Sequence, residues 1–207
     1  MIIDTGLIIA GYLLGSVASA IIVCKLLGLP DPRQGGSGNP GATNVLRLGG
    51  KKAAAITLAG DLLKGFLPVL AAAGLSRSDT AIGAVGIAAF LGHLYPVFFR
   101  FQGGKGIATA FGVVAGLSWV SVLAMAATWL LMARLSRYSS LGALTACTLT
   151  PGYIWLATAS AAFAGTTAVI AVFTYWRHRG NIRRLLSGTE PRIGEKAVAT
   201  EQPPAIN

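Results

Sequence analysis

Long apolar segments alternate with short polar loops along most of the chain. The apolar segments fall near residues 5–27, 53–74, 79–99, 106–134, 140–157 and 158–176. A helix needs about 20 predominantly apolar residues to cross the hydrocarbon core of a bilayer, so most of these segments match single spans in length. The pattern predicts an all-α, polytopic integral membrane protein.

The segment 106–134 is longer than one span requires, and it contains a small and polar patch around Ser118. It fits either one long tilted helix or a hairpin of two short helices. With one crossing, Arg134 and Arg137 would lie opposite the other basic loops, whereas two crossings place every basic loop and the tail on one side and leave only Arg77 on the other. Because positive charge marks cytoplasmic loops, we predict about seven transmembrane helices, with the N-terminus outside and the C-terminus in the cytoplasm.

The composition supports a membrane protein over an ordinary soluble domain. Hydrophobic residues make up 54% of the chain and charged residues only 12%, about half the charge of an ordinary soluble domain. The net charge of +10 comes from 17 Lys and Arg against 7 Asp and Glu. Since the basic residues lie between apolar segments, we expect them to set orientation and to meet anionic partners at the bilayer, and we expect no nucleic acid.

The chain is expected to form one domain without a metal or cofactor. Cys24 and Cys147 lie inside apolar segments, and the spacing of Cys and His matches no disulfide framework or metal site. We expect residues 1–186 to form a single membrane-embedded domain. Residues 187–207, which contain several prolines, are expected to form a flexible cytoplasmic tail of a protein of the cell inner membrane.

The loop after the first apolar segment, residues 35–47, is a candidate phosphate site. Its glycines allow several backbone N–H groups to face one anion, its hydroxyl and amide side chains add donors, and Arg47 offers a bidentate guanidinium. The candidate ligands are Ser37, Gly38, Asn39, Thr43, Asn44 and Arg47. Glycine-rich loops are often only turns, but the combination with amides, hydroxyls and arginine on the basic membrane face favours anion binding.

The same loop comes close to a nucleotide-binding P-loop but does not match it. Gly36, Gly41 and Thr43 have the required spacing, yet Ala42 stands where the essential lysine should be. A membrane span also precedes the loop in place of a strand. We therefore exclude nucleoside triphosphate binding.

A second glycine-rich loop carries a single lysine. Gly103, Gly104 and Gly106 surround Lys105 at the start of a predicted helix, where a helix N-terminus and a cation favour an anion. The alternative is an interfacial turn with a snorkelling lysine. His93 lies near the membrane end of the preceding segment, where a structural hydrogen bond and a catalytic role both stay open.

Three other places carry polar side chains that could support such a site. Asp61 and Lys64 lie three residues apart inside the second apolar segment, and we interpret them as a positional ion pair that supports the first loop. Ser140 begins a segment, as an N-cap often does. His178 and Asn181 follow the last segment three residues apart, so that one helical face can direct both at the site.

Together these motifs resemble the bacterial integral-membrane acyl-phosphate:glycerol-3-phosphate acyltransferase family (PlsY). The matching motifs are GSGNPGATN at 36–44, GDLLKG at 60–65, GHLYP at 92–96, GGKG at 103–106 and HRGNI at 178–182. The resemblance runs from about Tyr12 to Glu190. It departs after Ser140, where the family often has further serines and this chain has Gly142 and Ala143.

The resemblance implies transfer of a fatty acyl group from acyl phosphate to the 1-hydroxyl of glycerol 3-phosphate, which gives lysophosphatidic acid. Family-like roles would fall on Ser37 and its glycine loop, Arg47, Lys105, Ser140, His178 and Asn181. Acyl phosphate is a mixed anhydride whose phosphate leaves without strong acid assistance, so the enzyme needs mainly positioning and charge stabilisation. We expect direct attack by the hydroxyl, with its proton passing to a substrate phosphate oxygen or to His178.

A small transporter of organic phosphate or another anion is the main alternative. The intramembrane charges of Asp61 and Lys64 and the short helices within 106–134 suit a transporter. Transporters bind near the bilayer midplane, however, whereas the candidate phosphate ligands of this chain are predicted to gather on one membrane face.

Overall fold

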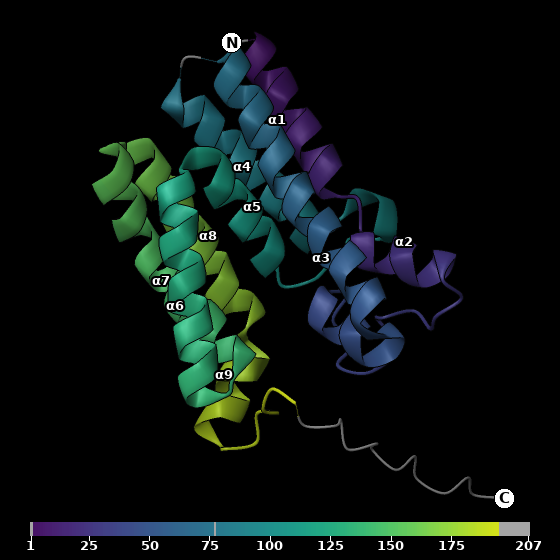
Figure 1. Ribbon diagram of the computed structural model, residues 1–207. Helices are drawn as coiled ribbons and strands as arrows, with labels where there is room; N and C mark the ends of the chain where they lie inside the picture. Colours follow the sequence, from purple (N-terminus) through teal and green to yellow (C-terminus); the bar gives the residue numbers. More distant parts are fainter. Residues whose placement is uncertain (1, 77, 195–207) are drawn as a thin grey trace, which may run out of the picture.

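The computed structural model describes residues 2–76 and 78–194, and in this part of the chain it contains helices and no strands (Figure 1). The helices are α1 (Ile2–Gly15), α2 (Ser19–Leu26), α3 (Ala42–Leu75), α4 (Asp79–Leu94), the 3-10 helix η1 (Val97–Phe99), α5 (Ile107–Leu117), α6 (Trp119–Ser136), α7 (Ser139–Thr158), α8 (Ala161–Arg177) and α9 (Arg179–Leu186). The predicted all-α class is confirmed.

The long helices run up and down between two ends of a bundle (Figure 1). At one end the turns before α4 and α8 meet, because Ser160 Oγ donates a 2.6 Å hydrogen bond to Asp79 Oδ2. The opposite end, here called the basic end, consists of residues 27–41, 95–106, 137–138 and 178–194. The start of the chain lies at the first end and its C-terminal part at the basic end.

The segment 106–134 is divided into α5 and α6 at Ser118, as the charge pattern predicts. Ser118 is extended and caps α6, since its side chain accepts a hydrogen bond from the Ser121 N–H at 3.2 Å. The two helices run in opposite directions (Figure 1). With 11 residues, α5 rises only about 16 Å, and its buried Val113 and Val114 pack against neighbouring helices. Arg77, predicted to lie alone at the other end, is outside the described residues.

The first apolar segment is not one continuous helix. It breaks after Gly15, and α2 begins at Ser19. At the break, Ser16 Oγ donates to the Tyr12 carbonyl, while the Val17 carbonyl accepts a 2.8 Å hydrogen bond from Lys64 Nζ. A charged donor thus takes up a carbonyl that a straight helix would bond internally.

Length and composition identify the helical stretches that can span a bilayer. Three stretches of the described chain qualify alone: α3, residues Asp79–Phe99 and α6. The pair α1 and α2, bent by 40°, makes a fourth if it counts as one span. Helix α3 is kinked at Gly50, whose φ of 75° is in the region that favours glycine.

Small residues bring the helices into close contact. A Cβ added at Gly15 would collide with the backbone of Ala89, and one added at Gly112 would collide with the Leu62 carbonyl. These contacts join α1 to α4 and α3 to α5, as expected where helices associate in lipid without a hydrophobic driving force.

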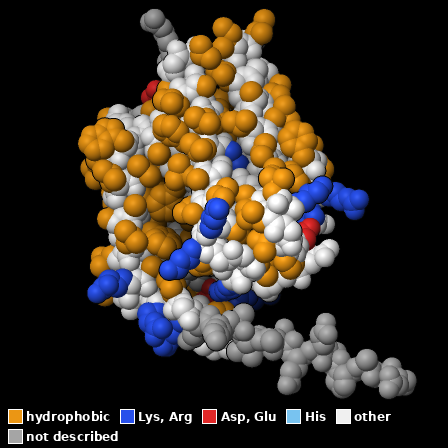
Figure 2. Space-filling view, turned by 45° about the vertical axis from the view of Figure 1, so that its right-hand side comes forward, with side chains coloured by type: hydrophobic (Ala, Val, Ile, Leu, Met, Phe, Trp, Pro, Cys, Tyr) orange, Lys and Arg blue, Asp and Glu red, His pale blue; other side chains and the backbone are white. Residues whose placement is uncertain are grey.

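Apolar side chains also cover the flanks of the bundle. Leu130, Leu156 and Val172 are all more than half exposed. Figure 2 shows orange apolar side chains over the body of the molecule and most of the Lys and Arg side chains toward its lower part. This distribution fits flanks that face lipid and a polar end that faces water.

Candidate active site

The first glycine-rich loop is held in shape by Asn44, a buried residue in the first turn of α3. Its Oδ1 accepts from the Ser37 N–H at 2.9 Å, and its Nδ2 donates to the carbonyls of Pro32 and Gly35, both at 2.9 Å. Asn44 was predicted as a phosphate ligand, but both ends of its amide are used inside the loop. In this structure Asn44 therefore holds the shape of the loop.

The outer side of this loop is open. Ser37, Gly38 and Thr43 are exposed and Asn39 is half-buried. Gly38 has a φ of 68°, which lets the backbone turn back on itself at this point. Exposed backbone and hydroxyl groups held by a buried amide are an arrangement that suits an anion.

The second glycine-rich loop packs against the first. A Cβ added at Gly104 would lie 2.5 Å from His93 Nε2 and 3.0 Å from the Pro40 carbonyl oxygen. Only glycine fits between these groups. The chain positions around 40 and 104 are therefore in direct contact at the basic end.

Arg177, the last residue of α8, fixes the second loop from the other side. Its Nε donates to the Gly104 carbonyl at 3.0 Å and its Nη2 donates to the Gly103 carbonyl at 2.8 Å. The guanidinium uses a bidentate geometry on two successive carbonyls. The sequence analysis did not assign Arg177 a place in this loop.

Lys105 connects the second loop to the C-terminal part of the chain. Its Nζ donates a 2.6 Å hydrogen bond to Asn181 Oδ1. Asn181 Nδ2 in turn donates to Glu190 Oε1 at 2.6 Å, and Ser140 Oγ donates to the same oxygen at 2.6 Å. Lys105, Asn181 and Ser140, all of them predicted site residues, are therefore linked through one carboxylate.

The sequence reading also missed the role of Glu190, which it placed in a flexible tail. Glu190 is only 8% exposed, and its second carboxylate oxygen accepts from Arg184 Nε at 2.8 Å. The Ile193 N–H also donates to the Arg137 carbonyl at 2.8 Å. The start of the tail is thus bonded to the bundle, and its part from residue 195 onward lies outside the described residues. A lone carboxylate 50 residues from its partner Ser140 gives no local sequence signal.

The cluster around Lys105 carries excess positive charge. The pKa of Lys105 is lowered to about 8, chiefly by burial and also by the charges of the nearby Arg184, Arg177 and Arg47, while Glu190 acts in the opposite direction. Hydrogen bonds from Ser140, among others, hold the pKa of Glu190 below its usual range despite the cost of burial. A buried lysine surrounded by arginines favours an anion that neutralises the charge.

His178 is buried beside this cluster. Its Nδ1 lies 2.8 Å from the Thr174 carbonyl, and since a carbonyl only accepts, Nδ1 carries the hydrogen. Burial and the charge of Lys105 lower the pKa of His178 to about 4. The ring is therefore neutral near pH 7, and Nε2 is its unprotonated nitrogen.

A buried polar network lies beneath the second loop. Lys64 Nζ is 2.8 Å from Asp61 Oδ1, and His93 Nδ1 is 3.6 Å from that oxygen and 3.1 Å from Thr109 Oγ1. His93 connects this network to the second loop, because its Nδ1 faces Asp61 and its Nε2 lies against Gly104. The ion pair thus takes a positional place, as predicted, but it underlies the second loop and the break at Val17 instead of the first loop.

The departure from the family pattern after Ser140 has a packing explanation. Gly142 and Ala143 are buried, and a Cβ added at Gly142 would lie 2.9 Å from the Trp129 carbonyl oxygen. These small residues let α7 approach α6 closely. In the described ranges, no group of three His, Cys, Asp or Glu side chains is placed to hold a metal ion.

Comparison with known proteins identifies the family of this chain. A protein-family model described as glycerol-3-phosphate acyltransferase matches residues 5–188. The chain is 58% identical over 197 residues to the glycerol-3-phosphate acyltransferase of Thioalkalivibrio sulfidiphilus, covering 95% of this chain and 97% of that protein. It is 55% identical over 187 residues to that of Methylococcus capsulatus, covering 90% and 94% of the two chains.

A solved structure also has the same fold. It is the crystal structure of PlsY (YgiH), an integral membrane glycerol 3-phosphate acyltransferase, in its glycerol 3-phosphate form, with a TM-score of 0.88 and 42% identity over 92% of this chain and 96% of that one. The lysophosphatidic acid form gives a TM-score of 0.85 and 39% identity, with 92% and 95% coverage. With most of its length matched in sequence and in fold, this chain belongs to the glycerol-3-phosphate acyltransferase family.

Proposed function

We propose that this protein transfers a fatty acyl group from acyl phosphate to the 1-hydroxyl of glycerol 3-phosphate. The products are lysophosphatidic acid and inorganic phosphate, in the first acylation of phospholipid synthesis. The observation that carries the proposal is the junction at Gly104 and Pro40, where two glycine-rich loops meet beside a cluster of cations. Both substrates carry phosphate, so two adjacent anion-binding loops suit them.

The phosphate groups are assigned to the most accessible donors of the two loops. Ser37, Gly38 and Thr43 are exposed and offer backbone and hydroxyl donors. Arg47 and Lys105 add two cations whose charges influence each other. Gly103 and Gly104 are assigned as further ligands through their backbone N–H groups. Their carbonyl oxygens already accept hydrogen bonds from Arg177.

The chemistry is a direct acyl transfer. The glycerol hydroxyl oxygen attacks the acyl carbonyl carbon, the bond from that carbon to the phosphate oxygen breaks, and inorganic phosphate leaves. The hydroxyl proton passes to the unprotonated His178 Nε2 or to a substrate phosphate oxygen. Asn181 and Ser140, both bonded to Glu190, position Lys105 and stabilise developing charge, which is the main demand when the leaving group is already good.

The proposed setting is the cell inner membrane, with about seven crossings and the basic end in the cytoplasm. The crossing helices are α1, α3, α4, α5, α6, α7 and α8, which alternate in direction between the two ends of the bundle (Figure 1). In this orientation the N-terminus lies outside. Soluble glycerol 3-phosphate reaches the basic end from the cytoplasm, while the acyl chain of the donor stays in lipid.

The transporter alternative is less well supported. Lys64 is engaged with Asp61 and with the Val17 carbonyl, so the intramembrane charges have partners inside the protein. The exposed donors lie at one end of the bundle and away from its middle. This arrangement favours an enzyme that binds both substrates at one membrane face.

The deciding experiment uses purified full-length protein in detergent and radiolabelled glycerol 3-phosphate. Acyl phosphate, acyl-CoA and acyl carrier protein loaded with an acyl thioester are offered as separate donors. We expect labelled lysophosphatidic acid with acyl phosphate and little with the other two donors. A transporter would form no labelled lipid under these conditions. Acyl transfer needs no second compartment and therefore continues in detergent, whereas transport does not.

A further inference from the structure

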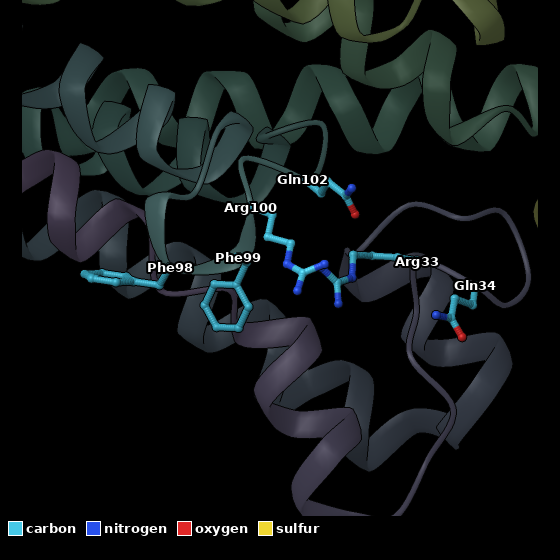
Figure 3. Close-up of a pocket in the computed structure, with 6 residues that line it drawn as sticks. All are labelled: Arg33, Gln34, Phe98, Phe99, Arg100 and Gln102. Carbon is cyan, nitrogen blue, oxygen red and sulfur yellow. The ribbon is translucent and has the colours of Figure 1, made fainter.

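A cavity of about 450 Å³ opens at the basic end, next to the two glycine-rich loops. Its lining residues are Arg33, Gln34, Phe98, Phe99, Arg100 and Gln102 (Figure 3). They come from two chain segments that lead directly into the loops of the candidate active site, since Gln34 precedes Gly35 and Gln102 precedes Gly103. None of the lining side chains belongs to the cluster around Lys105, so the cavity is a separate feature.

The polar wall of the cavity holds two guanidinium groups. Figure 3 shows the side chains of Arg33 and Arg100 extending toward one another from opposite segments. Arg33 is paired with Asp31, with 2.6 Å between Nη2 and Oδ2. That carboxylate offsets one of the two positive charges and leaves a net charge near +1. Two facing guanidiniums with one net charge form a complementary site for a phosphate group.

One side of the cavity, next to Arg100, is aromatic (Figure 3). Phe98 and Phe99 lie away from the glutamines in Figure 3, and Phe98 is 60% exposed. The adjacent Phe101 is 57% exposed. Exposed aromatic side chains beside arginines at the end of a membrane bundle match the interfacial zone, where apolar and hydrated groups meet. The cavity therefore has one wall for an anion and one for hydrocarbon.

The volume of the cavity also bears on its ligand. A volume of about 450 Å³ is far more than a phosphate group alone fills. The size lies within the range of ligand pockets, about 300–1,000 Å³. An amphiphile would use the whole space, with its phosphate between the arginines and the start of its chain against the aromatic wall.

We propose that this cavity is a second binding site, specific for a phosphate group carried by a lipid. The headgroup lies between Arg33 and Arg100, Gln34 and Gln102 donate to its remaining oxygens, and the chain leaves over Phe98 into the bilayer. The ligand is either a phosphodiester lipid of the membrane or an acyl phosphate. The inference rests on the cavity alone and does not require the proposed reaction.

The test uses full-length protein in nanodiscs of phosphatidylcholine and three probes with the same photoreactive diazirine chain. The probes are phosphatidylglycerol, a hydrolysis-resistant acyl phosphonate and uncharged diacylglycerol. Labelled peptides are mapped by mass spectrometry in the wild type, in Arg100→Gln and in the matched control Arg134→Gln. Arg134 is exposed at the end of α6 and does not line the cavity.

We expect one or both phosphate-bearing probes to label residues 97–102 and diacylglycerol to label them weakly. Arg100→Gln should reduce the labelling roughly tenfold, the loss expected for one charge-assisted hydrogen bond, and Arg134→Gln should not. Labelling by phosphatidylglycerol alone identifies a membrane lipid, and labelling by the phosphonate alone identifies a substrate-like lipid.

The proposal would be overturned by any of these results: no labelling of residues 97–102, equal labelling by diacylglycerol, no effect of Arg100→Gln, or an equal effect of the control. Displacement of the probes by inorganic phosphate at the same concentration would also reject a lipid site, since free phosphate lacks the chain. The acyl transfer activity of the wild-type nanodiscs is measured in parallel. An active enzyme with an unlabelled cavity removes this inference and leaves the proposed function standing.

Discussion

Lys105 donates a 2.6 Å hydrogen bond to Asn181, 76 residues further along the chain. This bond joins the glycine loop before α5 to the short helix that follows the last long one. Asn181 donates a hydrogen bond to Glu190, and Glu190 also accepts one from Ser140 of α7. The candidate site is therefore closed by the C-terminal part of the chain, and its cation is positioned by residues that the membrane helices alone would not supply.

Lys105→Ala is expected to abolish most of the acyl transfer without unfolding the bundle. The lysine is half-buried in the loop, and removal of one preorganised charge that faces a reacting group typically lowers kcat by about 10²–10³. Initial rates with purified protein measure the effect, and size-exclusion elution and circular dichroism report the fold. Near-normal turnover of a folded Lys105→Ala protein would remove this residue from the site.

Binding of glycerol 3-phosphate should weaken as the pH rises through about 8. The pKa of Lys105 is lowered to about 8, so the ammonium is charged below that pH and loses its charge above it. KM for glycerol 3-phosphate should therefore rise on the alkaline side. Lys105→Arg, whose guanidinium stays charged throughout, should remove that rise. An unchanged alkaline limb in Lys105→Arg would assign the titration to another group.

Glu190→Ala should destabilise the site more than its position in the tail suggests. The substitution leaves Asn181 Nδ2, Ser140 Oγ and Arg184 Nε without their shared acceptor, and a buried polar group that loses its partner costs about 1–3 kcal/mol. We expect a lower Tm and a lower activity, with partial recovery in Glu190→Gln. Ser187→Ala, at an exposed position in the same segment, is the control and should match the wild type.

The hydrophobic pattern predicted the helical class and, together with charge, the break of the fourth segment near Ser118. Local patterns suffice for these features, since hydropathy and positive charge are read along the chain. The break after Gly15 was not predicted, because it depends on Lys64, which reaches the Val17 carbonyl from another helix. The places of Glu190 and Arg177 were also missed. The bond from Glu190 to Ser140 spans 50 residues and those from Arg177 to the second loop span 73 and 74, so neither leaves a periodic trace in the sequence.

Gly104→Ala tests the contact between the two loops. The added methyl group would lie 2.5 Å from His93 Nε2 and 3.0 Å from the Pro40 carbonyl oxygen, so the loops must separate. We expect a large loss of activity and a raised KM for glycerol 3-phosphate. The matched control is Gly74→Ala, where an added Cβ meets nothing within 4 Å. Equal activity of the two variants would mean that the junction is not part of the site.

The proposed orientation of the bundle predicts from which side of the membrane introduced cysteines react. Single cysteines at Ser37 and Thr189 should react with an impermeant maleimide only from the cytoplasmic side, because both positions are exposed at the basic end. A cysteine at Ser78, at the start of α4, should react only from the outside. The native Cys24 and Cys147 are buried, so they contribute little background. Labelling of Ser37→Cys and Thr189→Cys from opposite sides would contradict a single site at one membrane face, because residues 27–41 and 178–194 form the same end of the bundle (Figure 1).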